Sequence, residues 1–274
     1  MPFLVLFLGM YLAPICVAVY KSLFVMHSQG LGLSGGPSTV FKPLANYTRA
    51  LGDSAFIGAI LRVLLFGVVQ VPVMLGLATL FALVIDAVSA RVRAAFRFAA
   101  FLPYVVPGVV AAMIWSLLYS PNPNASSPFF SNGLTLWSVA NVVTWTWTGY
   151  NMLIIYSALT AIPSEIIEAA RVDGASGWRI AWHVKLPMVR SSLILTTVFS
   201  IIGTAQLYNE PSILQAVSGG AISSTYTPVM AANNAIHVPD FQYAAALSVI
   251  LALVVGALSL GFFKLVNRRG PAWG

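Results

Sequence analysis

Three polar residues near the end of one apolar stretch could contact a solute: Gln206, Asn209 and Glu210. A polar or ionisable side chain at membrane depth is costly, so it is usually buried against protein or faces a water-filled path. The three residues are therefore candidates for lining a substrate pathway. An alternative stays open, in which Glu210 lies in the external headgroup zone and caps local structure there.

Aromatic and amide side chains in the preceding apolar stretch could bind a sugar: Trp145, Trp147, Tyr150 and Asn151. Aromatic rings suit the apolar face of a pyranose, and an amide can hydrogen-bond to its hydroxyls. The same residues could instead form an interfacial belt or pack helices together. The sequence does not separate these interpretations.

No catalytic, cofactor or metal site is predicted for this chain. The sequence holds no phosphate-binding loop of the form G-x-x-x-x-G-K-[ST], and His27, His183 and His237 are scattered rather than spaced as ligands. Cys16 is the single cysteine, so neither an intrachain disulfide nor a cysteine cluster is available. If the chain moves a solute actively, another chain must supply the energy.

The segment from Ile162 to Met188 has the signals of two short helices. Pro163 and Ser164 can begin the first helix, whose early turns carry negative charge, and Gly174 is placed to end it. The second is predicted from about Ser176 to His183. Together they form a helical hairpin.

The second helix of this hairpin carries Trp178 and Trp182 on one face, and Leu186 and Pro187 are expected to stop it. Isolated helices shorter than about 12 residues are marginal in water, so the hairpin needs a surface to rest on. It could dock on a partner protein through its small residues, or lie on the lipid headgroups with its tryptophans inserted.

Composition and length place these residues in a membrane protein. Hydrophobic residues make up 59% of the chain and charged residues 8%, with a mean hydropathy of +0.87, which excludes an ordinary water-soluble fold. A bilayer core about 30 Å thick needs roughly 20 apolar residues per helix. We predict an all-α membrane protein of about six transmembrane helices, at Phe3–Tyr20, Val63–Ile85, Phe98–Leu118, Trp137–Leu159, Leu193–Leu214 and Ala244–Phe263.

The distribution of Lys and Arg predicts the orientation of the chain. Ten of the 14 follow the second, fourth or sixth span, four lie between the first two spans, and none follows the third or fifth. Cytoplasmic connections carry the Lys and Arg excess, so both termini are predicted to be cytoplasmic. The net charge of +7 then reflects topology, and no nucleic-acid partner is expected.

Glycine and proline mark the irregular regions. The external connection, about residues 21–57, should hold a flexible loop from Gly30 to Ser38 and then a short helix leading into the second span. Pro72, Pro103 and Pro107 should kink the second and third spans, either for function or for packing.

The hairpin contains a spaced motif of small and acidic residues. Residues 168–170 read E-A-A, Gly174 follows after three residues, and residues 184–187 read V-K-L-P after nine more. This pattern resembles the EAA loop of permease subunits of binding-protein-dependent ABC importers, E-A-A, three residues, G, nine residues, I-x-L-P. Only Val184 departs from it, in place of isoleucine.

The resemblance implies the fold of an ABC type I importer permease, with a single transmembrane domain over residues 1–274 and a coupling loop over residues 162–188. It also implies that this loop contacts a separate ATPase. The implied coupling residues are Glu168, Ala169, Ala170, Asp173, Gly174, Leu186 and Pro187.

Other stretches resemble the sugar and glycerol phosphate group of these permeases. They are residues 45–47, 206–211, 218–220 and 243–248, and residues 267–270 look more like the MalF type of maltose permease than its MalG-type partner. The resemblance implies a heterodimer with a second permease subunit in the inner or plasma membrane. It further implies two ATPase subunits that hold ATP and Mg, an extracytoplasmic solute-binding protein and a carbohydrate substrate.

Three hypotheses are carried forward. The favoured one is a permease subunit that forms half of a translocation pathway for a sugar or sugar derivative, with another solute such as glycerol phosphate as its variant. The second is a secondary transporter or channel, for which only Glu210 offers an ionisable group inside the membrane. The third is a membrane-anchored interaction protein. Stable binding of a soluble ATPase separates the first from the other two.

Overall fold

The computed structural model describes residues 2–27, 38–120, 127–131, 133–238 and 240–267. The predicted flexible loop from Gly30, except for Ser38, lies outside these ranges. So do Arg268, Arg269 and Gly270, which entered the charge count and the MalF-type resemblance.

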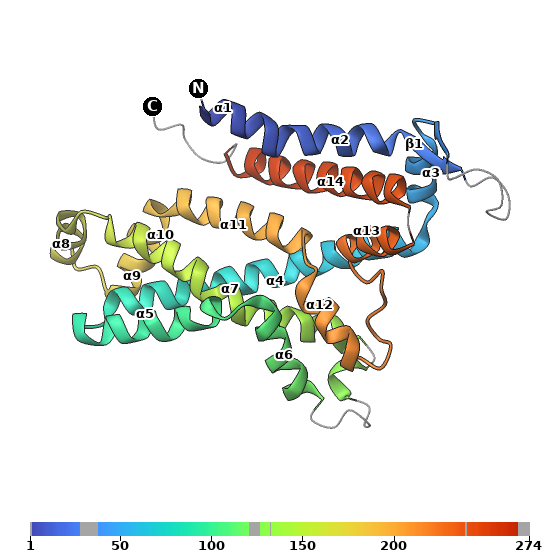
Figure 1. Cartoon of the computed structure of the whole chain (residues 1–274). Coiled ribbons are helices and arrows are strands. Elements are labelled where there is room, and N and C mark those ends of the chain that lie inside the picture. The colour runs from blue at the N-terminus through green and yellow to red at the C-terminus, as the bar shows by residue number, and fades with distance from the viewer. Residues whose placement is uncertain (1, 28–37, 121–126, 132, 239, 268–274) are drawn as a thin grey trace.

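Long apolar helices run side by side through the molecule (Figure 1). Within the described residues, four helices are long and apolar enough to cross a membrane, and there are up to six if each of two sharply bent pairs is one span. The prediction of an all-α protein with about six spans is confirmed. The long elements are α4 (Ser54–Ala87), α5 (Ala90–Val105), α7 (Leu134–Thr160), α11 (Arg190–Ala205) and α14 (Phe241–Asn267), and the first span joins α1 (Pro2–Phe7), η1 (Leu8–Leu12) and α2 (Ala13–Ser22).

Shorter elements connect or interrupt the long helices. They are β1 (Phe24–His27), β2 (Ser38–Phe41), α3 (Ala45–Gly52), α6 (Gly108–Tyr119), η2 (Pro128–Phe130), α8 (Ser164–Val172), α9 (Gly177–Ile180), η3 (Ala181–Lys185), α10 (Leu186–Met188), α12 (Asn209–Leu214), η4 (Gln215–Val217) and α13 (Pro228–His237). Helix α3 confirms the short helix predicted before the second span. The antiparallel pairing of β1 with β2, which sets Phe24 opposite Phe41 and His27 opposite Ser38, was not predicted, and neither was α13.

The third predicted span is not one helix, because the chain turns sharply between α5 and α6. The two helices meet at an angle of 91° across Val106 and Pro107. The ring of a proline disfavours helical backbone in the residue before it, and Val106 is extended, with φ −68° and ψ 124°. Pro107 therefore breaks the span outright, whereas Pro72 and Pro103 lie inside continuous helices.

The fifth predicted span is also interrupted. Helix α11 ends at Ala205, residues 206–208 leave helical geometry, and α12 begins at Asn209. Figure 1 shows α6 and α12 leaving the direction of the long helices together, and the two pack against each other. Two broken spans therefore meet on one side of the bundle.

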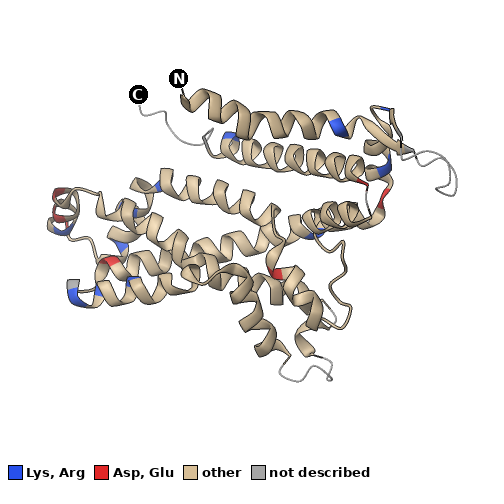
Figure 2. Ribbon diagram, viewed as in Figure 1, with Lys and Arg blue, Asp and Glu red and all other residues tan. Residues whose placement is uncertain are grey.

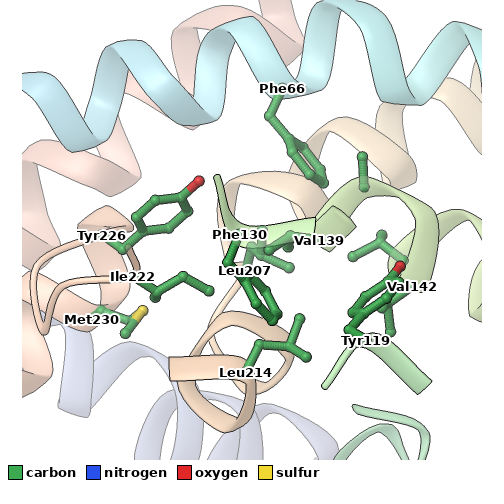
Figure 3. Close-up of a cluster of buried hydrophobic side chains, with 12 residues drawn as sticks. Phe66, Tyr119, Phe130, Val139, Val142, Leu207, Leu214, Ile222, Tyr226 and Met230 are labelled. Carbon is green, nitrogen blue, oxygen red and sulfur yellow. The ribbon is translucent and has the colours of Figure 1, made fainter. Parts of the chain in front are cut away.

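A buried apolar cluster holds these broken segments against α7 (Figure 3). Tyr119 at the end of α6, Leu214 in α12 and Val139 in α7 belong to it, together with Phe66 of α4. The hydroxyl of Tyr119 also donates to the backbone oxygen of Ser138, 3.0 Å away. Close packing of these large side chains stabilises the broken segments against α7.

Helices α5 and α7 approach each other closely at Gly149. A Cβ atom at this position would collide with the backbone carbonyl of Ala100 and with the Cα atom of Phe101. A glycine is therefore required here, since backbone cannot move aside as the end of a flexible side chain can. The contact fixes α5, and so the start of the broken third span, against the helix that carries the predicted sugar-binding aromatics.

Charged residues gather at the two ends of the bundle (Figure 2). One end carries α8, α9, η3 and α10, and the first helix begins and the last helix ends on the same side (Figure 1). The opposite end carries β1, β2, α3 and the start of α14. We call them the hairpin end and the strand end.

Candidate functional site

The turn of the hairpin is built around Gly174. Helix α8 ends at Val172, and Gly174 adopts a left-handed backbone conformation with φ +77°. The amide of Ala175 donates to the oxygen of Ala170 and that of Gly174 to the oxygen of Arg171, both at 3.0 Å. This pair of hydrogen bonds is the Schellman arrangement that ends a helix at a glycine. The predicted start and end of the first hairpin helix are confirmed.

The second half of the hairpin corrects the prediction. The side-chain oxygen of Ser176 accepts a hydrogen bond from the amide of Arg179 and so begins α9, as expected. Leu186 and Pro187, however, do not stop the helix, since helical structure continues through η3 and α10 to Met188. The helix continues past this point because η3 is a π turn and Pro187 lies in the first turn of α10. At that position a proline, which has no backbone N–H, removes no hydrogen bond from the helix.

The second half of the hairpin packs against the helix bundle, whereas the first half, α8, is exposed. Ile180 and Val189 are buried, and Val189 packs into a cluster with residues of α4 and α7. The ammonium of Lys185 pairs with the carboxylate of Asp86 at the end of α4. Helix α8, by contrast, has no buried residue.

The predicted coupling residues lie on this exposed half or on its support. Glu168, Ala169, Asp173, Gly174 and Pro187 are exposed, while Ala170 and Leu186 are half-buried. Apolar side chains are exposed beside them: Val172 is 88% exposed and Trp178 71%. The rings of Trp178 and Trp182 stack, with centroids 5.7 Å apart. Exposed apolar surface of this kind marks a site where another molecule rests.

A second candidate site is a pocket of about 290 Å³ inside the bundle. Six of the seven side chains named as candidates from the sequence line it, although they come from two segments far apart in sequence. They are Trp147, Tyr150 and Asn151 of α7 and Gln206, Asn209 and Glu210 around the break between α11 and α12. The interruption of the fifth span thus turns its polar residues toward α7.

Trp145, the remaining candidate, does not line this pocket, whereas Trp147 does. The ring of Trp145 meets that of Trp115 at 5.9 Å and 77°, so it packs α7 against α6. Because α7 turns about 100° per residue, side chains two positions apart face different neighbours.

Glu210 is 8% exposed and lies in the first turn of α12. One of its carboxylate oxygens lies 3.8 Å from the position of a Cβ built on Gly108, the first residue of α6. It shares the pocket with Met74, which is far from either end of α4. Neither of the ion pairs between described residues includes Glu210.

Gln70 supports the pocket and was not singled out from the sequence. It is 2% exposed, its amide nitrogen donates to the Thr144 hydroxyl at 3.3 Å, and its oxygen accepts from the Thr204 hydroxyl at 3.4 Å. These contacts tie α4, α7 and α11 together beside the pocket. The sequence does mark this residue, because Gln70 is the one amide in the apolar run from Val63 to Ile85.

Comparisons with known proteins agree with this architecture. The family described as "Binding-protein-dependent transport system inner membrane component" matches residues 74–269. The lactose transport system permease protein LacF of Rhizobium radiobacter is 29% identical, over 92% of this chain and 91% of its own. The sn-glycerol-3-phosphate transport system permease protein UgpA of Agrobacterium fabrum is also 29% identical, over 98% and 93%.

A solved structure shares the fold. It is that of a bacterial alginate ABC transporter in complex with an alginate pentasaccharide-bound periplasmic protein. One of its chains superposes with a TM-score of 0.78 at 16% identity, over 97% of this chain and 92% of that chain.

Proposed function

The chain belongs to the family of inner membrane components of binding-protein-dependent transport systems, and from this premise we propose that it carries a sugar or sugar derivative through half of a translocation pathway. It is a permease subunit of an ABC importer, and such subunits are not catalytic themselves. The pocket beside the broken fifth span is the proposed part of that pathway. Its amides and its carboxylate suit sugar hydroxyls, and Trp147 and Tyr150 suit an apolar sugar face.

The proposed energy source is a separate ATPase that docks on the hairpin. The exposed residues of α8 and its turn, from Glu168 to Gly174, support this proposal, since they form a small-residue surface with an apolar border. ATP and Mg would be held by that subunit, and movement would reach the bundle through Lys185 and Asp86. The hairpin end, and with it both termini, is then cytoplasmic.

The proposed assembly contains this chain, a second permease subunit, two ATPase subunits and an extracytoplasmic solute-binding protein. The family description, which names binding-protein-dependent transport, and the periplasmic protein in the related alginate transporter structure support the last of these. A glycerol phosphate substrate is the alternative that the likeness to UgpA favours. LacF, of similar identity, is a lactose transport permease and favours a sugar.

Uptake by the complete complex in proteoliposomes tests the proposal. We expect radiolabelled lactose or another saccharide to accumulate only with internal ATP and with the solute-binding protein outside. Uptake of sn-glycerol 3-phosphate but not of any saccharide would replace the sugar assignment by the alternative. Accumulation driven by an ion gradient in vesicles that hold this chain without the ATPase would overturn the importer proposal itself.

A further inference from the structure

The charged side chain in the described lining of the pocket is acidic. Glu210 is the single charged residue among the side chains that line it, and no Lys, Arg or His contributes to the described lining. The polar remainder, which includes Asn151, Gln206 and Asn209, is neutral. An anion that entered would meet a carboxylate and no cation.

The cations of the chain do not line the pocket, and most of them lie toward the ends of the bundle (Figure 2). Arg62 is occupied, because its guanidinium donates to the backbone oxygen of Tyr226 at 2.7 Å and lies over that ring. Glu210 therefore sets the sign of the charge that the described lining can carry.

The Glu210 side chain is buried where the two broken spans meet. Glu210 and Pro211 are buried, and α12 packs against α6. The Glu210 carboxylate faces Gly108 at the beginning of α6, where the free amides of a helix start favour negative charge. Side chains fixed in this way act on every solute that passes.

The opposite wall suits a neutral polyol. Tyr150 stacks on Tyr104 with centroids 4.7 Å apart, and Trp147 meets Tyr150 edge to face at 5.9 Å. These rings offer an apolar face, while the amides and the carboxylate accept hydrogen bonds from hydroxyls. A phosphate or a sugar acid would bring a negative charge beside that carboxylate, and the described lining holds no cation to pair with it.

We propose that Glu210 makes this half of the pathway selective against anionic solutes, so that the substrate is an uncharged saccharide and not a sugar phosphate, sugar acid or glycerol phosphate. The statement about substrate selection rests on the proposed function. The electrostatic claim, that an anion is disfavoured in the pocket, can be tested without knowledge of the substrate.

Thiol labelling of the assembled complex measures this directly. Gly203 lines the pocket, and a side chain built on it meets nothing within 4 Å, so Gly203→Cys in a Cys16→Ser chain places one thiol there. The probes are the neutral hydroxyethyl and the anionic sulfonatoethyl methanethiosulfonates, with labelling of this chain followed by mass spectrometry. Relative to their rates with a free thiol, we expect the anionic reagent to react at least tenfold more slowly than the neutral one.

Two variants make the outcome decisive. Glu210→Gln should remove most of the tenfold difference, and Glu210→Asp should retain it. A reference thiol at Gly52, which is exposed at the strand end with open space around it, should show no dependence on residue 210 and reports correct folding. If the Gly203→Cys thiol gives equal rate ratios with and without the Glu210→Gln substitution, the inference is overturned.

The same variant separates this inference from the proposed function. If wild-type complex imports lactose but not a sugar phosphate and Glu210→Gln raises uptake of the phosphate, selection by Glu210 is supported in transport. If the labelling difference holds but no saccharide is imported, the proposed sugar function fails while the anion barrier stands. Import of a sugar phosphate by the wild-type complex as fast as its neutral parent would overturn the inference.

Discussion

The two ends of the helix bundle treat their charged and apolar side chains differently. At the strand end, Arg49 pairs with Asp240 at 2.6 Å and lies over the ring of Tyr243, whose hydroxyl donates to Asp53. At the hairpin end, no ion pair between described residues includes Glu168 or Asp173. At the strand end these groups bond to one another, whereas at the hairpin end Lys185 pairs with Asp86 but Glu168 and Asp173 are exposed.

Apolar side chains are exposed at both ends, but their surroundings differ. At the hairpin end, Val172 and Trp178 are exposed beside a motif of small residues, on helices too short to stand alone. At the strand end, Asn46 donates to the backbone oxygens of Ser22 and Phe24 and closes the first span onto α3. The contrast supports the proposal that the hairpin docks on a partner, whereas the strand end is held by contacts of its own.

The largest effect in this comparison is expected from a charge placed on the exposed apolar part of the hairpin. Val172→Glu should weaken ATPase binding by roughly 30-fold, about 2 kcal/mol, because buried apolar contacts dominate interfaces. Val238, 67% exposed at the end of α13, gives the matched variant Val238→Glu, which should leave ATPase binding unchanged. Affinity is measured by titrating the ATPase onto the permease pair in nanodiscs. Equal losses for both variants would erase the contrast.

A smaller effect is expected from the two ion pairs, one at each end. The pair of Lys185 with Asp86 is 19% and 17% exposed, and that of Arg49 with Asp240 is 56% and 22% exposed. Lys185→Met leaves a partly buried carboxylate without its partner and should lower the free energy of unfolding by about 1 kcal/mol. Arg49→Met should cost about 0.5 kcal/mol, since exposed pairs contribute little.

Thermal unfolding of the complex in nanodiscs, followed by tryptophan fluorescence, ranks the two variants. A chain with Lys185→Asp and Asp86→Lys should regain most of the loss, because the swapped charges can pair again. Failure of the swap to recover stability would show that the pair contributes by packing and not by charge.

The smallest effect is expected from the hydrogen bond of Tyr243 to Asp53, 3.1 Å long. Tyr243→Phe removes the hydroxyl and keeps the ring under Arg49, so it should destabilise the strand end by about 0.5 kcal/mol or less, at the low end for a single hydrogen bond. ATP hydrolysis in the complex should keep its stimulation by the loaded solute-binding protein. A loss of stimulation would mean that the strand end also takes part in coupling.

The sequence predicted elements wherever local signals determine the structure. The start of α8 and its end at Gly174 follow from short-range capping rules. The membrane spans follow from the length of the apolar runs. The sequence did not predict that the helix continues past Pro187, because a π turn accommodates a proline that a regular helix would exclude.

Tertiary features were harder to predict. The polar residues of the fifth span were found, but not the break that turns them toward α7, because that break is stabilised by packing of α12 on α6 and α7. Trp145 and Trp147 are equivalent in composition, and only the rotation of α7 decides which one reaches the pocket. Gln70 could have been found, since one amide in an apolar span is a signal in itself.

The central claim is that the hairpin couples a separate ATPase to the bundle. ATP hydrolysis by the reconstituted complex, with and without the loaded solute-binding protein, tests it in the variants Gly174→Asp and Gly133→Asp. Both glycines have positive φ, +77° and +86°, and open space for a side chain, so both variants carry similar backbone strain. Only Gly174 lies in the proposed ATPase contact.

We predict that Gly174→Asp loses the stimulation of hydrolysis while the permease pair stays assembled in the membrane, and that Gly133→Asp keeps it. Full stimulation in the Gly174→Asp complex would contradict the account, because a charged and larger residue would then be tolerated where the hairpin is proposed to dock.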